Sequence, residues 1–500
     1  MPGQLARHEV RKLTPLAAGI LAEFTDIVGP RGMVTDEAAL APYLAETRGR
    51  CRGTTPLVLL PASTAEVVAV MRVCTARHIG VVPQGGNTGL VGGAVPRTAA
   101  GRPEVVLSTR RLNRIRQIDP ENFAITAEAG CILQQVQMAA AEVDRLFPLS
   151  LGAEGSCQLG GNISTNAGGT AVLRYGTMRD LVLGLEVVLP DGRVLDGLRS
   201  LRKDNSGYDL KHWFIGAEGT LGIVTAAVCK LFPRPRTVVT AWLAVPDVET
   251  AVRIQAAMRR ELGDDLTAFE FANGLTLELV LKHIPGTVAP LATASPWHLL
   301  VEISTARDDA SLPAQVEEFL ARLQVDGLIS DGVVASSGAQ RDALWHLRHV
   351  MPEAQVRAGA SIKHDVSVPI TAMARFLDLA MAEASRRLPG VRFISFGHLG
   401  DGNVHFNLSQ PVGADAATFL ANRDEITRKT HEIAASLGGS FSAEHGVGLF
   451  KLDDLVRWRG GTALELMQTL KQAIDPLGIM NPGKVLAARH PGPSGDPGTS

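Results

Sequence analysis

Two glycine-rich stretches constrain this 500-residue chain more than any other feature of its sequence. They read PQGGNTGLVGGAVP at residues 83–96 and GAEGSCQLGGNISTNAGGTAVLRYG at residues 152–176. Glycine costs conformational entropy in an ordered element, so such clusters mark backbone with positive φ or a close approach to another group. Tight turns are one interpretation, and a nest of backbone N–H groups that binds the phosphates of a cofactor is the other. The interspersed Ser, Thr and Asn residues of the second stretch favour the cofactor.

Neither stretch carries a familiar nucleotide-binding fingerprint. No Gly-x-Gly-x-x-Gly stands between a strand and a helix with an acidic residue about twenty positions on. No Gly-x-x-x-x-Gly-Lys-Ser/Thr occurs either. NAD and ATP bound through those motifs are therefore disfavoured.

Length and composition predict more than one packed domain, because 500 residues with 45% hydrophobic content exceed what one core usually supports. The net charge of −2 gives no electrostatic reason to expect nucleic acid or an anionic membrane as the partner. Five scattered cysteines indicate neither a disulfide framework nor a thiolate zinc site and favour a reducing compartment. Neither a secretory signal nor a transmembrane helix is recognisable, so we expect a cytoplasmic protein. The basic start leaves an organelle-targeting segment open, with the organelle matrix as the location in a eukaryote.

Hydrophobic patterning divides the chain into five expected segments. Residues 1–50 show helical spacing, and β-branched runs separated by Gly, Pro and Asn predict an α+β domain at 51–235. The prolines of PRPR mark its end. Helices and strands then alternate, which predicts a second α+β domain at 236–440 with an antiparallel sheet covered by helices on one face. A partly helical C-terminal segment is expected at 441–486, and the Pro/Gly/Ser-rich residues 487–500 are expected to be disordered.

Histidines and a carboxylate gather in the second domain. ISFGHLGDGNVHFNLS predicts a β-hairpin that turns at LGDGN and places His398 and His405 on facing strands. The period of two puts His405 and Asn407 on one face. Two imidazoles with a carboxylate suit zinc, manganese or iron, and Glu444 in SAEHGVG is the candidate third ligand. A metal site and a pair of histidines with purely structural hydrogen bonds both remain open.

His445, the neighbour of Glu444, is the candidate base, because an unperturbed imidazole titrates near pH 6.5. Adjacent residues on a strand point to opposite faces, so both side chains reach one centre only if SAEHGVG is a loop or a helix entrance. Gly446 and Gly448 favour the loop.

Two cations are candidates for substrate recognition. RDALWHLRHVMPEAQ places Arg348 on a helix, and ASIKHDVSVP places Lys363 on a following strand. Either cation alone is explained by a solvated surface charge. Together they could bind a carboxylate, the arginine through a bidentate fork and the lysine as a point charge.

The two glycine-rich stretches, FIGAEGTLGIVT and MNPGKVL together resemble the FAD-binding domain of the vanillyl-alcohol oxidase and p-cresol methylhydroxylase superfamily. The match is collinear over nearly the whole chain. The resemblance implies that the first loop wraps the FAD pyrophosphate through Pro83, Gly85, Gly86, Asn87, Thr88 and Gly89. It implies that the second stretch lines the cofactor through Gly155, Ser156, Gly160, Gly161, Asn162, Thr165, Asn166 and Gly169. It also implies that Gly219, Ile223 and Asn481 lie near the flavin.

Asn87 stands where members of the superfamily with covalently attached flavin often carry a histidine. The resemblance therefore implies that FAD is held noncovalently.

GHLGDGNVHFN with SAEHGVG resembles the metal-dependent D-2-hydroxyacid dehydrogenase branch of this superfamily. The branch includes D-2-hydroxyglutarate dehydrogenase, the flavin type of D-lactate dehydrogenase and the glycolate oxidase flavin subunit. The resemblance implies that His398, His405 and Glu444 bind zinc or a similar divalent ion. It also implies that His445 is the catalytic base in contact with the substrate and that Asn407 contacts the substrate.

Arg348 and Lys363 match the residues of the D-2-hydroxyglutarate enzyme that hold the distal carboxylate. Pro352 stands where that enzyme has a threonine, one helical turn after the arginine, so a different D-2-hydroxyacid stays open.

The function expected from this resemblance is oxidation of a D-2-hydroxyacid, with D-2-hydroxyglutarate first, to the 2-oxoacid. The hydride would pass to flavin N5 and the electrons to an external acceptor, namely electron-transfer flavoprotein, a quinone or a cytochrome. The nearest alternative is a D-lactate dehydrogenase of the same branch, and a flavin-free zinc protein is a more distant one. The expected partner is a small molecule and not a nucleic acid, and a homodimer is left open.

Overall fold

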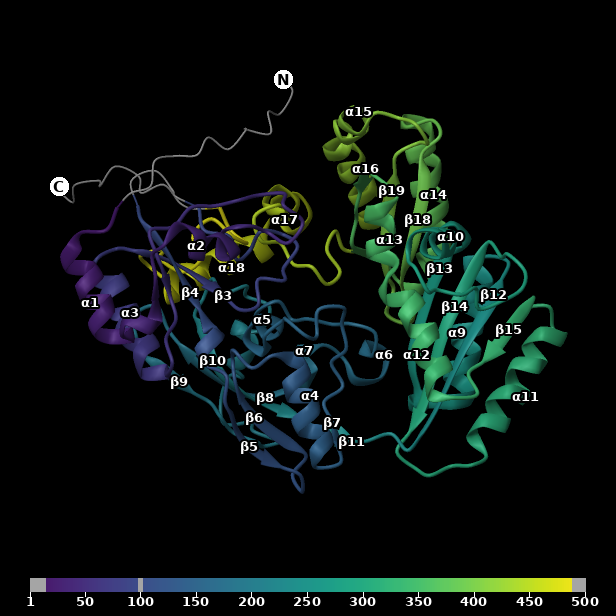
Figure 1. Cartoon of the computed structure of the whole chain (residues 1–500), viewed down its shortest axis with the longest axis horizontal. Helices are drawn as coiled ribbons and strands as arrows, with labels where there is room; N and C mark the ends of the chain where they lie inside the picture. The colour runs from purple at the N-terminus through teal and green to yellow at the C-terminus, as the bar shows by residue number, and fades with distance from the viewer. Residues whose placement is uncertain (1–14, 98–101, 488–500) are drawn as a thin grey trace.

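The computed structural model describes residues 15–97 and 102–487 and forms two lobes (Figure 1). The first lobe runs from α1 to β11 and includes α17 and α18, whereas the second lobe runs from β12 to α16. The basic start and nearly all of the tail expected to be disordered fall outside the described residues.

A four-stranded sheet with the order β1-β2-β4-β3 forms one half of the first lobe. Its strands are β1 (Met33–Val34), β2 (Val58–Leu59), β3 (Gly80–Gln84) and β4 (Glu104–Ser108). The last three run parallel, and β1 is antiparallel to β2. The helices α1 (Ala18–Val28) and α3 (Thr64–Ala76) pack on this sheet through buried apolar residues. The first of the two lies near the start of the described residues.

The second half of this lobe is a five-stranded antiparallel sheet with the order β5-β6-β10-β8-β9. Its strands are β5 (Ile115–Asp119), β6 (Ala124–Glu128), β8 (Val182–Val188), β9 (Val194–Asp196) and β10 (Ile223–Lys230). The helices α4 (Leu133–Glu142) and α5 (Leu159–Ser164) supply buried residues to the same core. The first glycine-rich stretch begins in β3 of one sheet, and the second contains α5, whose buried residues belong to the core of the other sheet.

An eight-stranded sheet forms the centre of the second lobe, and all of its pairings are antiparallel, as predicted. In spatial order its strands are β15 (Asp331–Val334), β12 (Thr237–Val245), β14 (Trp297–Thr305), β13 (Leu266–Asn273), β18 (Arg392–His398), β19 (Asn403–Ser409) and β16 (Ser361–Ile362). A short strand, β17 (Val366–Ser367), also pairs with β19.

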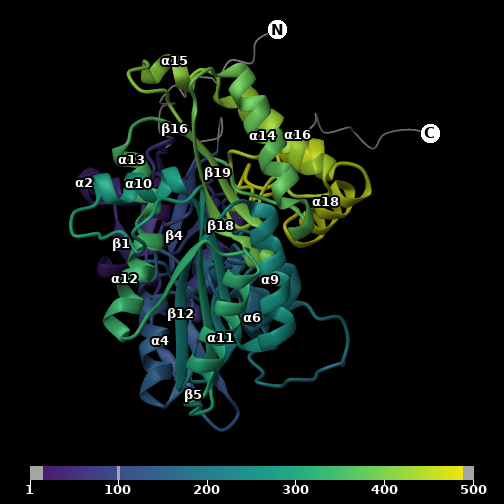
Figure 2. The same ribbon diagram turned by 90° about the vertical axis from the view of Figure 1, so that its right-hand side faces the viewer.

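Helices cover both faces of this sheet, so the prediction of a single covered face is wrong (Figure 2). One group comprises α9 (Val248–Leu262), α11 (Leu312–Val325), α14 (Met373–Arg387) and α16 (Arg423–Ser436). The other comprises α10 (Gly274–His283), α12 (Gly338–His349) and α13 (Met351–Arg357). Central strands are apolar on both sides: Trp242 belongs to one core and the adjacent Leu243 to the other. Such strands bury both faces.

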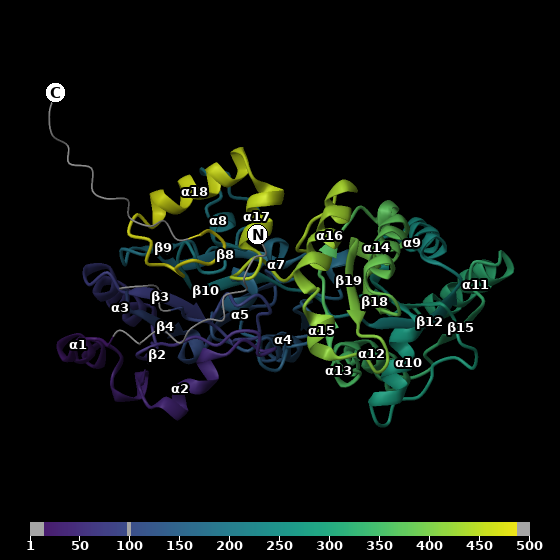
Figure 3. The ribbon, with the colours of Figure 1, turned by 90° about the horizontal axis from the view of Figure 1, so that it is seen from above.

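The C-terminal segment returns to the first lobe (Figure 3). It contains α17 (Leu452–Arg459) and α18 (Thr462–Ile474), which confirms the expected C-terminal helices. Beyond them the backbone pairs with β3, because Val81 N–H donates to Ile479 O at 2.8 Å and Asn481 N–H donates to Val81 O at 2.7 Å. Residues 479–481 therefore belong to the first lobe, beside a strand from the N-terminal part of the chain.

Candidate functional site

The hairpin of β18 and β19 carries the two histidines of GHLGDGNVHFN. Its connection includes Gly402 at φ +80°, where an added Cβ would lie 2.2 Å from a backbone oxygen of Val368, so only glycine fits. His405 and Asn407 share one face of β19, whereas Phe406 lies buried in the core on the opposite face. This is the alternation that the sequence predicted.

SAEHGVG is a loop, as its glycines indicated, and a buried carboxylate holds it. The N–H groups of Glu444 and His445 donate to Oδ2 of Asp365 at 3.1 and 2.9 Å. Gly446 and Gly448 have φ of +81° and +50°. Both side chains therefore reach one centre although they are adjacent in the chain.

Glu218 of the first lobe holds the other end of the same loop. Its carboxylate accepts hydrogen bonds from the N–H groups of Val447 and Gly448 at 2.7 and 2.8 Å. Its backbone oxygen accepts from Nδ2 of Asn481 at 2.8 Å. The loop is thus anchored to both lobes at once.

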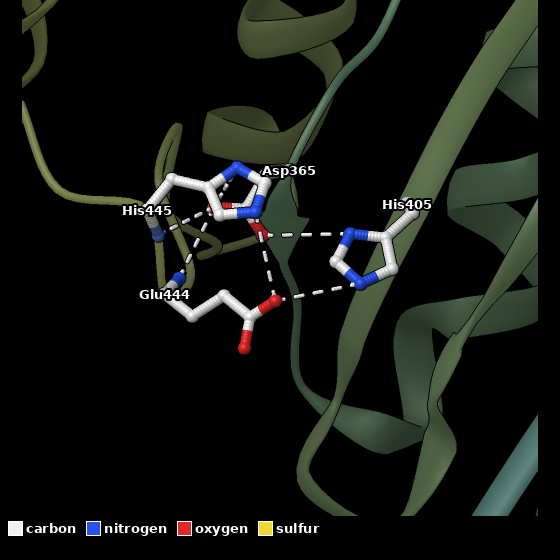
Figure 4. A group of neighbouring side chains, drawn as sticks. All are labelled: Asp365, His405, Glu444 and His445. Carbon is white, nitrogen blue, oxygen red and sulfur yellow. Dashed lines mark hydrogen bonds and ion pairs between the residues drawn. The ribbon is translucent and has the colours of Figure 1, made fainter. Parts of the chain in front are cut away.

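Four side chains, those of Asp365, His405, Glu444 and His445, place their ligand atoms within 4.8 Å of one another (Figure 4). The Nε2 atoms of His405 and His445 lie 3.5 and 3.6 Å from Oε1 of Glu444. Their Nδ1 atoms lie 3.8 and 3.4 Å from the carboxylate of Asp365. Asp365 therefore faces Nδ1 of each ring, and Glu444 faces Nε2.

His398 also lies between two carboxylates, with Glu270 in place of Asp365 at Nδ1. Its Nδ1 is hydrogen-bonded to Oε1 of Glu270 at 2.7 Å, and its Nε2 lies 3.9 Å from Oε2 of Glu444. The rings of His398 and His405 are 5.7 Å apart between centroids. A histidine whose second nitrogen is fixed by a carboxylate is typical of metal ligands. The donor set of the three predicted ligands therefore fits a divalent metal.

Burial and neighbouring charges determine the protonation of these groups. Burial raises the pKa of Glu444 to about 7, even though His398 attracts its charged form. Burial disfavours the charged form of His398 too, but attraction by Glu270 and Glu444 raises its pKa to about 9. Burial lowers the pKa of His445 to about 4, which leaves a neutral imidazole near pH 7. Such an imidazole can accept a proton through Nε2.

Arg348 is not a solvated surface charge, because its side chain is buried. Its Nε donates to Oε2 of Glu270 at 2.7 Å, and its guanidinium lies 5.2 Å from the ring centroid of Phe396. Glu270 therefore joins Arg348 to His398.

Lys363 lies half-buried on the segment between β16 and β17 and makes no ion pair with another described residue. Burial lowers its pKa to about 8. The next residue, His364, donates its N–H to Oδ1 of Asn407 at 3.1 Å, and Asn407 donates through Nδ2 to Gln355 at 3.1 Å. Lys363 and Asn407 therefore belong to neighbouring segments on the sheet.

The two glycine-rich stretches lie against each other. A Cβ added at Gly86 would lie 2.1 Å from the backbone oxygen of Ser156, so a larger residue would force the loops apart. The N–H groups of residues 86–89 donate no hydrogen bond to any described residue. Free amides in a glycine-rich loop suit a pyrophosphate, so this loop fits the phosphates of FAD.

A cavity of about 290 Å³ links the second stretch to the SAEHGVG loop. Thr165, Asn166, Glu218 and Glu444 are among the residues that line it. Two of the predicted cofactor residues and one of the predicted metal ligands therefore share one cavity.

Other predicted cofactor residues have different surroundings. Gly219 has φ of +71° and packs on Pro83, 3.0 Å from the position of an added Cβ. An added Cβ at Gly160 would lie 2.6 Å from Ala129, and one at Gly169 would lie 1.9 Å from a backbone oxygen. Close packing explains glycine at both of these positions. Ile223 is buried in a hydrophobic core.

Asn481 carries an oxygen unpartnered among the described residues, and open space or solvent adjoins Gly89, Gly161, Gly155 and Ser156. By contrast, an added Cβ at Gly85 would lie 3.5 Å from Gln158, and the amide of Asn162 donates to Sγ of Cys157 at 3.5 Å. Oδ1 of Asn481 is buried without a hydrogen-bond partner among the described residues, which leaves an acceptor for a ligand. An added Cβ at Gly89 or Gly161 would meet no atom within 4 Å, so open space adjoins these glycines. Gly155 and Ser156 are exposed beside them.

Sequence reasoning missed three carboxylates: Glu218, Glu270 and Asp365. Each had a signal. Asp365 stands two positions after Lys363 in ASIKHDVSVP. Glu270 interrupts an apolar strand, and Glu218 lies in a glycine-containing stretch, GAEG. A charge inside an apolar strand is costly unless it is paired, which is the reason to look for its partner.

Two protein families match this chain. The FAD binding domain family matches residues 55–197, and the family of FAD linked oxidases, C-terminal domain, matches residues 234–485, which is more than half of the chain. The chain belongs to the FAD-linked oxidases. It is therefore an FAD-dependent oxidoreductase.

Relatives of this FAD-linked oxidase cover most of its length. D-2-hydroxyglutarate dehydrogenase, mitochondrial, from Arabidopsis thaliana is 38% identical, over 93% of this chain and 80% of the relative. A Schizosaccharomyces pombe protein, named provisionally as a mitochondrial D-lactate dehydrogenase, is 35% identical over 95% of this chain and 92% of the relative.

The fold of this FAD-linked oxidase is shared with solved structures. That of p-cresol methylhydroxylase with bound substrate matches with a TM-score of 0.73 at 17% identity, over 95% of this chain and 99% of the other. The predicted fold, with an FAD-binding domain of this type, is thereby confirmed. No helix among the described residues is long and apolar enough to cross a membrane.

Proposed function

We propose that this FAD-linked oxidase oxidises a D-2-hydroxyacid to its 2-oxoacid, with D-2-hydroxyglutarate as the first candidate substrate. One observation carries the proposal: three imidazole Nε2 atoms face the carboxylate of Glu444, which lines a cavity shared with the cofactor stretch. The names of the relatives support the substrate class.

The glycine-rich loops would hold FAD without a covalent bond. The free N–H groups of residues 86–89 would bind its pyrophosphate, and Asn481 would offer its unpartnered oxygen. Bound FAD would supply a hydride acceptor at N5. As the external electron acceptor we propose electron-transfer flavoprotein, a quinone or a cytochrome.

His398, His405 and Glu444 would hold a divalent metal, with zinc as the first candidate. Their nitrogen and oxygen donors suit zinc, and Glu270 and Asp365 stand behind the two imidazoles. Asp365 lies near the same centre, but it already accepts the backbone N–H groups of the loop, so we assign it the role of orienting the histidines. A bound metal supplies a Lewis acid that lowers the pKa of a coordinated hydroxyl.

His445 would remove the hydroxyl proton of the substrate. Its Nδ1 faces Asp365, and its Nε2 faces the centre. A carboxylate behind an imidazole stabilises the imidazolium that forms when the ring accepts a proton. Asp365 would therefore support both the orientation and the basicity of His445.

The far end of the substrate would meet Arg348, Lys363 and Asn407. Lys363 is the best placed to bind a second carboxylate, because it has no ion pair among the described residues. Arg348 is already bound to Glu270, so it would share its guanidinium between that carboxylate and the substrate.

Oxidation of D-lactate is the second candidate function. Pro352 lies in the first turn of α13 and brings no hydroxyl or N–H group to this region, which weakens the case for a substrate as long as hydroxyglutarate. The name of the S. pombe relative points the same way. We propose the cytoplasm as the location, or the organelle matrix in a eukaryote, and the mitochondrial names of relatives support the latter.

Anaerobic reduction of the bound flavin by a panel of D-2-hydroxyacids tests the proposal. We expect D-2-hydroxyglutarate to bleach the visible absorption, and His445→Asn to slow this at least 100-fold, within the range for loss of a general base. Chelation should slow bleaching without releasing FAD, and added zinc or manganese should restore it. A near-normal rate in the variant would rule out the base assignment, and a rate insensitive to chelation would rule out the metal.

A further inference from the structure

Gln355 on α13 is a buried amide that the proposed mechanism does not use. Its side chain is 1% exposed, and its Oε1 accepts a hydrogen bond from Nδ2 of Asn407 at 3.1 Å. Its Nε2 is buried and has no hydrogen-bond partner among the described residues. Leaving a buried donor without an acceptor is destabilising, so an acceptor supplied by a ligand would explain why this residue is present.

A backbone donor fixes the orientation of both amides. The N–H of His364 donates to Asn407 at 3.1 Å, and because a backbone N–H can only donate, the oxygen of Asn407 must face it. The nitrogen of Asn407 then faces Gln355, so Gln355 must accept the hydrogen bond through its own amide oxygen. Both amide oxygens are thereby engaged, and the pair presents N–H donors to anything that binds beside it.

This amide pair lies on the proposed substrate side of the sheet. Asn407 shares its face of β19 with His405, and α13 packs on that same face through Met351 and Ala354. Lys363 precedes the residue that fixes Asn407. Donors and a cation without an ion pair therefore gather at the place where the far end of the substrate would lie.

We infer that Gln355 is a positioning residue that determines specificity: it holds Asn407 as a donor, adds its own N–H groups, and so selects a D-2-hydroxyacid with a second carboxylate. This inference rests on the proposed function. It also bears on Pro352, because Gln355 lies nearly one turn later on the same helix and supplies hydrogen-bonding capacity that the proline lacks.

Two variants test the inference by turnover. Gln355→Met keeps the volume and removes both hydrogen-bonding roles, and Gln355→Glu keeps the acceptor for Asn407 but replaces the donors with a negative charge. We expect the KM for D-2-hydroxyglutarate to rise at least fivefold in the first and tenfold in the second, with kcat changed less than twofold. The KM for D-lactate should change less than twofold. Glu353→Gln, at an exposed position of the same helix, is the matched control.

Binding of non-oxidisable acids tests the inference apart from the reaction. Calorimetry on the holoenzyme should show glutarate, a dicarboxylate, binding at least tenfold more weakly to Gln355→Glu than to the wild type. Butyrate, a monocarboxylate, should bind the two proteins alike. Equal weakening of both acids, unchanged glutarate binding, or a wild type that does not bind glutarate would overturn the inference. Failure of every hydroxyacid to reduce the flavin would overturn the proposed function instead.

Discussion

Buried histidines of this FAD-linked oxidase differ in the group that faces Nδ1. Nδ1 of His398 meets the carboxylate of Glu270, whereas Nδ1 of His298 accepts a hydrogen bond from Nε1 of Trp242 at 3.2 Å. A carboxylate favours the charged ring and orients the opposite nitrogen toward a ligand. An indole N–H donor instead favours the neutral ring, because only an unprotonated ring nitrogen can accept its hydrogen bond. His398 belongs to the candidate site, whereas His298 is a buried histidine that serves the packing of the second lobe.

The core histidine gives the protein a specific sensitivity to acid. Burial lowers the pKa of His298 to about 4, whereas an unfolded histidine titrates near 6.5. The unfolded chain therefore binds a proton that the native state excludes, and stability falls as the pH drops from 6.5 toward 4. We expect His298→Gln, which keeps an acceptor for Trp242, to lose about 2 kcal/mol less unfolding free energy than the wild type between pH 7 and pH 5. Urea unfolding at the two pH values measures this difference, and equal losses would contradict it.

Sequence reasoning identified His398, His405, Glu444 and His445 because their residue types and short spacings are visible along the chain, and the structure brings them together. Glu270 could not be found in this way. It meets His398 through the pairing of β13 with β18, strands separated by most of the second lobe's helices. Partners that depend on strand order are invisible until the sheet is known.

At the level of elements, the loop at residues 440–448 depends on carboxylates at two places. Asp365 accepts two of its N–H groups, and Glu218 accepts two more. No helix or strand stabilises the loop from within. Its shape therefore depends on these two carboxylates from other segments, together with hydrogen bonds inside the loop such as that from Oγ of Ser442 to the backbone oxygen of Gly446 at 2.7 Å.

Removing Glu218 should loosen this loop. Each hydrogen bond to a charged acceptor is worth about 1.5–3 kcal/mol, so we expect Glu218→Leu to slow flavin reduction at least tenfold and to expose residues 446–448 to proteases. Limited proteolysis followed by mass spectrometry, together with anaerobic reduction rates, measures both effects. Glu317→Gln, at an exposed position on α11, serves as the control. An uncut loop with an unchanged rate in the leucine variant would refute this role.

The elements themselves were predictable to different degrees. The β18–β19 hairpin followed from a Gly-Asp-Gly turn between two alternating runs, which is local information. The second layer of helices was not expected, because α10 and α12 look like ordinary amphipathic helices whichever face they cover. Apolar residues on both sides of central strands such as β12 and β14 are the signal that could have indicated it.

At the level of the whole molecule, the candidate site lies where the two lobes meet. The cavity beside Glu444 takes one wall from Thr165 and Asn166 of the first lobe and another from the loop that follows the second lobe. Each lobe contributes part of the site, and neither contains all of it.

Cofactor binding should therefore stabilise the whole chain. A ligand at a hundred times its Kd adds about 2.7 kcal/mol to the unfolding free energy, so FAD should raise the melting temperature of the apoprotein by a few degrees. Riboflavin has no pyrophosphate to meet the free N–H groups of residues 86–89, and we expect a clearly smaller shift. Thermal unfolding with each compound at equal concentration measures this. Equal stabilisation by the two would show that the loop does not bind the phosphates.

The pairing of β3 with residues 479–481 has a consequence for biosynthesis. A ribosome that has just made the glycine-rich loops must still make the entire second lobe before Ile479 and Asn481 can reach Val81. During that interval the nascent first lobe lacks the backbone that lies beside β3, an edge strand of its four-stranded sheet. A translation product that stops before this point has the loops that would bind the cofactor, but it lacks Asn481, which donates a hydrogen bond to Gly93 of the first loop. The yellow colour of bound flavin would therefore distinguish completed chains from truncated ones.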